Sequence, residues 1–225
     1  DNVVSVVPVV PSSSNTWIKT FVVTTGFDSG NSVLQTTDGG YIILGNTYGN
    51  GNSGVYLIKT DDNGDSLWTK PLEGGSDLQQ TNDGGYIITG SRDSLFGGYL
   101  IKTDSSGNEQ WNKTFGGRIT CWSVQQTTDG GYIILGNTYG NGNSGVNLIK
   151  TDGNGDSLWN KTFGGINDLD EGITVQQTID GGYIILCYSS SCNYCPKLIK
   201  TDGGGNEQWN KMFVGIGSGN SLDQT

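Results

Sequence analysis

Acidic and amide side chains recur at alternate positions of two glycine-containing segments of this 225-residue chain. Oxygen ligands in that spacing suit a hard cation such as Ca²⁺, so we expect calcium there. Each segment lacks the later bidentate Glu of an EF-hand loop, and the same residues are also typical of a hairpin turn that binds no metal. The residues are Asp61, Asn63, Asp65, Asp152, Asn154 and Asp156.

A second acidic segment, "GINDLDEG" at 165–172, concentrates Asp168, Asp170 and Glu171. It is a further calcium candidate, with a solvated acidic loop as the alternative. The net charge of −10 favours attraction of divalent cations and repulsion of nucleic acid and anionic lipid. We therefore expect neither a nucleic-acid partner nor membrane insertion.

Four cysteines could form covalent or metal-binding sites: Cys121, Cys187, Cys192 and Cys195. In a secreted protein this number favours two disulfides, whose pairing the sequence leaves open. The C-x-x-C spacing of the last two could instead contribute to a four-thiolate zinc site.

Histidine is absent, which removes the usual general base and the commonest transition-metal ligand. Paired carboxylates could still act as a glycosidase dyad, but turn chemistry explains the repeated Asp residues without any reaction. We expect no enzyme activity. Two N-K-T sequons, at Asn112 and Asn160, predict N-glycosylation if the export pathway supports it.

An internal repeat positions these residues. "SVLQTTDGGYIILG" at 32–45 recurs in three variant copies, at 77–90, 123–136 and 174–187, with their Asp residues 45 to 51 positions apart. Each copy is followed by an "LIKTD" segment and then a Trp segment such as "WNKTF". One unit thus holds four strands in about 45 residues, the size of a propeller blade. The repeats lie near 32–76, 77–122, 123–173 and 174–225.

We predict an all-β fold: a β-propeller of four-stranded antiparallel blades, most simply four, with an open solenoid as the alternative. The "DGG" segment predicts a two-residue type I′ hairpin, and Gly64 and Gly155 suit the left-handed position of a bulged turn. "YIIL" is apolar on both faces and predicts a central strand, whereas "SVQQT" predicts the innermost strand. The Trp residues that recur once per unit are interpreted as packing residues.

The motifs "WNKTFGG", "VQQTTDGGYIILG" and "LIKTDGNGDSLW" resemble the repeat of secreted and cell-surface β-propeller proteins of archaea and bacteria. The resemblance covers about residues 17–225. It implies a propeller outside the cell that serves in adhesion, surface coating or filament building. The valine-rich N-terminus and the cysteine-bearing loop of the fourth unit depart from that pattern.

The first residues, "DNVVSVVPVVPSSSN", form a separate segment, 1–16. The run lacks the flanks of a signal peptide and is too short to span a membrane. The chain begins with Asp, so we expect a processed, exported form. We predict that the arm adds as a strand to a neighbouring subunit, the alternative being closure of its own propeller. Its subunit-interface residues are Val3, Val4, Val6, Val7, Val9 and Val10.

The two ends of the repeat support this prediction, because the sequence 209–225 is similar to 17–36. Four units therefore come with a fifth copy of this half-unit, which a closed ring of four blades does not need. We expect a subunit of an extracellular filament or surface assembly, joined to itself head to tail and stabilised by calcium. A secreted carbohydrate-binding propeller or adhesin, with glycans as partners, is the alternative.

Overall fold

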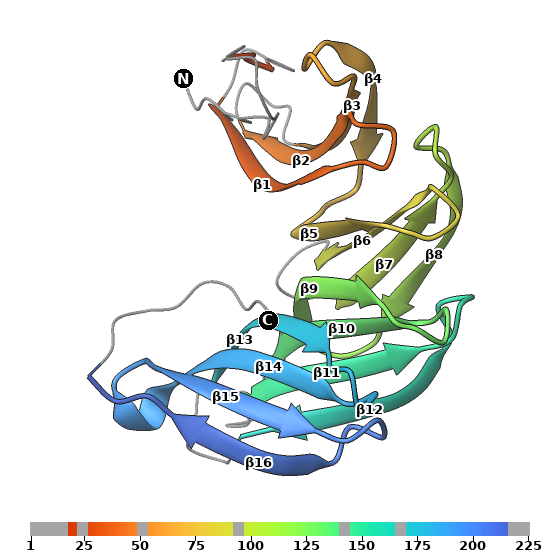
Figure 1. The fold of residues 1–225 in the computed structure, drawn as a ribbon. Helices are drawn as coiled ribbons and strands as arrows, with labels where there is room; N and C mark the ends of the chain where they lie inside the picture. Colours follow the sequence, from red (N-terminus) through yellow and green to blue (C-terminus); the bar gives the residue numbers. More distant parts are fainter. Residues whose placement is uncertain are drawn as a thin grey trace, which may run out of the picture.

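The computed structural model describes residues 18–21, 27–48, 54–91, 97–139, 145–164 and 170–215. They form sixteen strands in four antiparallel sheets, which confirms the all-β, four-blade prediction (Figure 1). The only helix in these ranges is a short 3₁₀ turn, Ser190–Cys192. No helix there has the length and apolarity needed to cross a bilayer. The valine arm lies outside the described residues.

Each blade is a meander in which the strands follow one another in chain order. Blade 1 comprises β1 (Phe27–Gln35), β2 (Tyr41–Tyr48), β3 (Gly54–Thr60) and β4 (Ser66–Leu72). Blade 2 comprises β5 (Asp77–Gln80), β6 (Tyr86–Ser91), β7 (Gly98–Thr103) and β8 (Glu109–Phe115). Blade 3 comprises β9 (Ile119–Gln126), β10 (Tyr132–Thr138), β11 (Gly145–Thr151) and β12 (Ser157–Phe163). Blade 4 comprises β13 (Glu171–Gln177), β14 (Tyr183–Ser189), β15 (Cys195–Thr201) and β16 (Glu207–Met212).

The core lies between successive blades. Three apolar clusters fill the junctions of blades 1 and 2, 2 and 3, and 3 and 4. The second and third strands supply most of each cluster because their runs are apolar on both faces, as expected for central strands covered from both sides. Burial of these faces is the main favourable term that holds one blade on the next.

The first strands of neighbouring blades contact one another, β1 with β5, β5 with β9 and β9 with β13, so the prediction of an innermost first strand is confirmed. Their glutamines bind the backbone of the next blade rather than only lining an inner surface. The Gln125 side-chain oxygen accepts from the Gln177 main-chain N–H at 2.6 Å. In the reverse direction, the Gln177 side-chain oxygen accepts from the Thr128 N–H at 2.9 Å.

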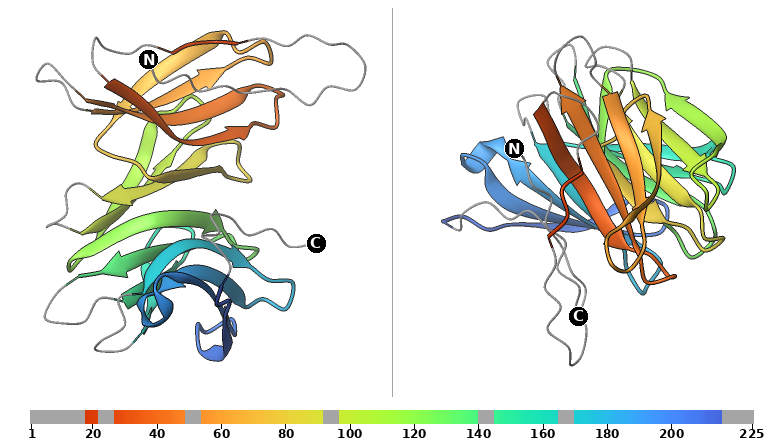
Figure 2. Two further views of the ribbon diagram at one scale, coloured as in Figure 1. Left: turned by 90° about the vertical axis from the view of Figure 1, so that its left-hand side faces the viewer. Right: turned by 90° about the horizontal axis from the view of Figure 1, so that it is seen from above.

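The four blades form an open array in the described residues. Blades 1 and 4 lie at its two ends (Figures 1 and 2), and no pair of their described strands makes more than marginal contact. Repetition in the sequence predicts the blades and their order, but the rotation from one blade to the next comes from packing at the junctions. The predicted architecture of four antiparallel blades is therefore confirmed, and within the described residues no substantial contact joins blade 4 to blade 1.

The turn between the first two strands of each blade differs from the predicted type I′ hairpin. In blade 1, the Thr36 N–H donates to the Gly40 carbonyl at 2.9 Å, and Gly39, with φ +90°, is the turn's residue in the left-handed region. A type I′ turn needs positive φ at both central residues. The second glycine has another cause, because a Cβ on Gly40 would lie 2.1 Å from the Thr60 carbonyl oxygen. The predicted left-handed Gly64 and Gly155 are confirmed, with φ +76° and +79°.

Candidate functional site

The predicted calcium residues of blade 1 lie in the turn between β3 and β4. The Asp61 carboxylate accepts hydrogen bonds from the main-chain N–H groups of Asn63, at 2.9 Å, and Asp65, at 2.8 Å. The Asp65 carboxylate pairs with Lys19 Nζ at 2.5 Å. A cation would therefore compete with donors that these oxygens already have.

The equivalent turn of blade 3 repeats this geometry. Asp152 accepts from the N–H groups of Asn154 and Asp156, both at 2.9 Å, and Asp156 pairs with Lys113 at 2.6 Å. The turns of blades 2 and 4 use Asp104 and Asp202 in the same way. Within the described ranges, no three potential ligands from His, Cys, Asp and Glu cluster as a metal would require. Calcium binding at these residues stays a prediction.

The second acidic segment is described only in part, since Asp168 lies outside the described residues. Asp170 is buried and its carboxylate accepts from Lys197 Nζ at 2.9 Å. Glu171 begins β13 and is exposed. The two side chains therefore lie in different environments, although they are adjacent in the sequence.

The four cysteines do not form the two expected disulfides. Cys192, the last residue of the 3₁₀ turn, is bonded to Cys195, the first residue of β15, whereas Cys121 and Cys187 are free, buried thiols. These two belong to different core clusters, at the junction of blades 2 and 3 and that of blades 3 and 4, which is why they do not pair. Burial raises the pKa of each thiol to about 12, so both are poor nucleophiles.

The sequon asparagines lie on the outermost strands. Asn112 in β8 and Asn160 in β12 are both exposed, which is the setting that a glycan needs. The Asn112 amide donates to the Glu109 carboxylate, and the Asn160 carbonyl accepts from the Asn147 amide at 2.7 Å. Glycosylation at the two positions stays a prediction.

A buried lysine occurs once in every blade and was not predicted from the sequence. Lys102 Nζ donates to the Asp83 carboxylate at 2.8 Å and to the Thr103 carbonyl at 2.8 Å, and its side chain is only 5% exposed. The recurring "DGG" and "LIKTD" motifs were a signal for this pair, since Asp and Lys recur together. The equivalent pairs are Lys59 with Asp38, Lys150 with Asp129 and Lys200 with Asp180.

The same residue types form the contact between each blade and the next. The Trp of the fourth strand packs edge-on against the Tyr that begins the second strand of the following blade, as Trp159 does with Tyr183 at a centroid distance of 5.8 Å. Trp68 with Tyr86 and Trp111 with Tyr132 repeat the contact. The lysine two residues after each Trp reaches the following blade's outer turn; these contacts are Lys70–Asn108, Lys113–Asp156 and Lys161–Asn206.

The corresponding face of blade 4 is open. Trp209 is 46% exposed, and every residue of β16 is exposed, whereas β4, β8 and β12 alternate between exposed and covered positions. Ile184 and Leu198 are partly exposed, although their equivalents in blades 1 to 3 are fully buried under the next blade. Blade 4 therefore presents, uncovered, the surface that the other blades bury.

Residues 18–21 occupy the opposite end, beside blade 1. Lys19 pairs with Asp65 as Lys113 of blade 2 pairs with Asp156 of blade 3. The short segment thus takes the place that the fourth strand of a preceding blade would have. The second and third strands of such a blade have no counterpart in the described residues.

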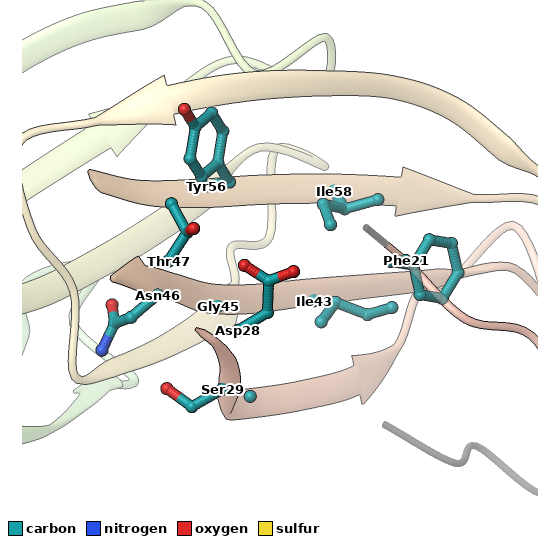
Figure 3. Close-up of a pocket in the computed structure, with 10 residues that line it drawn as sticks. Phe21, Asp28, Ser29, Ile43, Gly45, Asn46, Thr47, Tyr56 and Ile58 are labelled. Atoms are coloured by element: carbon teal, nitrogen blue, oxygen red, sulfur yellow. The ribbon is translucent and has the colours of Figure 1, made fainter. Parts of the chain in front are cut away.

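A small pocket lies next to this segment on the outer face of blade 1. Its volume is about 30 Å³, and Asp28 points into it between Tyr56, Phe21 and two isoleucines, Ile43 and Ile58 (Figure 3). Asp28 Oδ1 is buried and accepts no hydrogen bond. Asp28 was not predicted as a site residue because it lies before the repeated motif begins.

No family model matches the chain, and no curated protein matches it by sequence. Two crystal structures of bacterial proteins described as of unknown function have a similar fold. One, from Bacteroides caccae, is 11% identical with a TM-score of 0.57 and is matched over 86% of this chain and 70% of its own. The other, from Dyadobacter fermentans, is 13% identical with a TM-score of 0.58 over 85% and 70%. These likenesses concern the fold alone.

Proposed function

We propose that the protein is a structural subunit of an extracellular filament or surface assembly, in which blade 4 of one copy stacks on the N-terminal end of the next. The observation that carries the proposal is the open face of blade 4. Trp209, with 46% of its surface exposed, sits where Trp159 packs on Tyr183 of the next blade. An apolar face that recurs as a buried junction three times in the same chain suits a further junction between chains.

The two ends of the array are complementary in type. Blade 1 has the same outer turn as blade 3, and its Asp65 pairs with Lys19 of the segment 18–21, so docking of another blade on this turn would replace the Lys19 contact. Blade 4 ends in Trp209 and Lys211, which are the residue types that contact the following blade at the other junctions, in the same spacing. Because the two faces differ, repeated stacking is head to tail and produces an open fibre unless the rotation closes a ring.

The valine arm is the second part of the proposal. Its residues, Val3 to Val10, come shortly before the segment 18–21 in the sequence, and Lys19 of that segment pairs with Asp65 of blade 1, the blade on which the next copy would dock. An apolar strand with Pro8 inside it suits addition at a sheet edge, because proline cannot donate a ladder hydrogen bond. Strand addition would supplement the stacking of the blades.

The test is the concentration dependence of the assembly, measured by sedimentation velocity and by electron microscopy of negatively stained protein. Trp209→Glu should keep the chain monomeric and folded. The matched control is Leu158→Glu, which places the same charge at a position that is 59% exposed in β12. Assembly by Trp209→Glu as extensive as that of the control would contradict blade stacking. Deleting 1–11 separately tests the arm, whose proposed role fails if deletion leaves the assembly unchanged.

The alternative, a carbohydrate-binding propeller, would instead predict glycan binding by the monomeric Trp209→Glu variant.

Calcium is proposed to stabilise the assembly or its subunit. A ligand that binds the folded chain raises its melting temperature by linkage, so chelator should lower it. An unchanged melting temperature in excess chelator would remove calcium from the proposal.

A further inference from the structure

The pocket on blade 1 contains a carboxylate with one buried oxygen that has no hydrogen bond. This oxygen is Asp28 Oδ1. Figure 3 shows the carboxylate pointing into the pocket, between the Tyr56 ring and the Ile43 and Ile58 side chains, with the Phe21 ring at one end. Buried acceptors of this kind normally have a donor, so the pocket has a polar requirement that the described chain does not meet.

Blade 4 shows which donor suits this position. Asp170 precedes β13 by one residue, and the β13–β14 register places it opposite Ser189, as Asp28 is opposite Thr47 in blade 1. There, Lys197 Nζ donates to Asp170 Oδ2 at 2.9 Å, while Asp170 Oδ1 is buried without a hydrogen bond, as Asp28 Oδ1 is. The repeat therefore contains the same carboxylate twice, and in blade 4 it holds a primary ammonium group.

In blade 1 the position of Lys197 is taken by Tyr56, as the strand registers show: Tyr56 pairs with Gly45, and Lys197 pairs with the equivalent Cys187. None of the ten residues that line the pocket is a lysine or an arginine. Among the described residues at this pocket, blade 1 thus has the acceptor but no cation in the place of Lys197. We infer that this pocket binds a primary alkylammonium group from outside the chain, either the side chain of a lysine on a partner protein or a free alkylamine.

The dimensions and lining agree with this ligand. A volume of about 30 Å³ has room for roughly two waters, enough for an ammonium and its adjoining methylene but not for a sugar ring. The isoleucines offer apolar contact to the methylene stem, and the aromatic rings at the pocket provide faces that attract a cation. Ca²⁺ takes six to eight oxygen ligands, whereas the described lining has one carboxylate, and its other side-chain oxygens, on Ser29, Asn46, Thr47 and Tyr56, are neutral. A single ammonium therefore suits the charge of the pocket better than a divalent cation.

The first experiment measures binding of n-pentylammonium to the full chain by calorimetry, at a protein concentration where sedimentation shows monomer. n-Pentanol is the neutral comparison. We expect saturable binding of the amine, none of the alcohol, and a loss of at least tenfold in affinity in Asp28→Asn. The control variant is Asp62→Asn, which removes one exposed carboxylate from the outer turn of the same blade and should bind the amine normally.

The second experiment restores the internal cation. Tyr56→Lys recreates the blade 4 pair, so it should abolish amine binding and raise the melting temperature. A capped Gly-Lys-Gly peptide distinguishes the two sources: binding as tight as that of pentylammonium identifies a lysine side chain, and weaker binding identifies a free amine. Absence of amine binding, equal binding by Asp28→Asn, or displacement of the amine by Ca²⁺ would each overturn the inference. Because all measurements use monomer, a failure of the proposed assembly leaves this test unaffected.

Discussion

Lys102 Nζ lies 2.8 Å from Asp83 Oδ2, and this pair ties the first turn of blade 2 to its third strand. The ammonium also donates to the Thr103 carbonyl at 2.8 Å and to the Gln110 side chain at 3.2 Å. It therefore hydrogen-bonds to the first turn, the third strand and the fourth strand of one blade. A buried lysine is costly unless it is paired, and here the pairing is complete. The contacts of the lysine with the aspartate and with the carbonyl recur in every blade, whereas the glutamine contact occurs in blades 2 and 4.

Removing this ammonium should destabilise the protein. Lys102→Met keeps most of the apolar stem but leaves the Thr103 carbonyl without its donor, for which we expect a loss of about 1–3 kcal/mol in the free energy of unfolding. The control is Lys113→Met, since Lys113 forms a more exposed pair with Asp156. Such pairs contribute about 0–1 kcal/mol. Equal losses for the two variants, measured by urea unfolding, would contradict the structural role of Lys102.

Acid should weaken the fold through the same pairs. Burial alone would raise the pKa of Asp83, but hydrogen bonds from Lys102 and Thr81 lower it to about 2, and Asp129 behaves likewise with Thr127 and Lys150. A carboxylate with a lowered folded-state pKa contributes stability above its ordinary value of 3.8, and that contribution is lost as the pH falls towards 2. Urea midpoints should therefore fall between about pH 4 and pH 2, and a flat profile there would refute the effect.

The two glycines of each "DGG" turn should respond differently to alanine. Gly84 has φ +82°, and a Cβ added there would have no atom within 4 Å, so Gly84→Ala should cost only the conformational strain, about 1 kcal/mol. A Cβ on Gly85 would lie 2.1 Å from the Thr103 carbonyl oxygen, so Gly85→Ala must move the backbone. We expect the larger loss of thermal stability for Gly85→Ala. A larger loss for Gly84→Ala would contradict the view that the close approach of the Thr103 carbonyl is the reason for the glycine at position 85.

Replacing Asp77 on the inner strand β5 should increase the stability of the folded protein. Burial raises its pKa, although it accepts from the Val124 N–H at 3.0 Å and the Ser32 hydroxyl at 3.1 Å. A raised folded-state pKa means stability that is present below the ordinary value of 3.8 and lost as the pH rises through the folded value. Asp77→Ser, which copies the Ser123 of blade 3, should therefore raise the unfolding midpoint at pH 7 relative to wild type, and this advantage should shrink at pH 3.

The cysteines should separate into two classes. Without reductant, the unfolded protein should take up two equivalents of iodoacetamide, at Cys121 and Cys187, because Cys192 and Cys195 are bonded to each other. In the folded protein both thiols should react far more slowly, since burial raises their pKa to about 12. Peptide mapping by mass spectrometry checks both statements. Four labelled cysteines in the unreduced, unfolded chain would contradict the bridge.

Local sequence signals predicted the strands and turns of the blades well, but they predicted contacts between distant strands and between blades poorly. The strand order and the left-handed Gly64 follow from short motifs, because a turn or a strand is decided by neighbouring residues. The pairing of Lys102 with Asp83 depends on a register across two strands that no single motif contains. The open face at Trp209 was not predictable, since the residue is the same as in the other blades and only its missing neighbour differs.

The pocket at Asp28 was missed for a related reason. Its carboxylate has no partner because Tyr56 stands where blade 4 has Lys197, a difference between two copies of a repeat rather than a motif in either one. The pairing of the cysteines likewise depended on which junction each one entered, and spacing along the chain does not reveal that.

The contact of each blade with its immediate neighbours alone has a mechanical consequence. In a closed ring, every blade is clamped on both sides, and a pull on the chain ends must rupture the whole circle. In the described residues, blade 4 has a neighbouring blade on one side only, so tension would peel the array from that end and extend the chain one blade at a time. A fibre built from such units could lengthen under load and absorb energy before any of its subunits separated from the next.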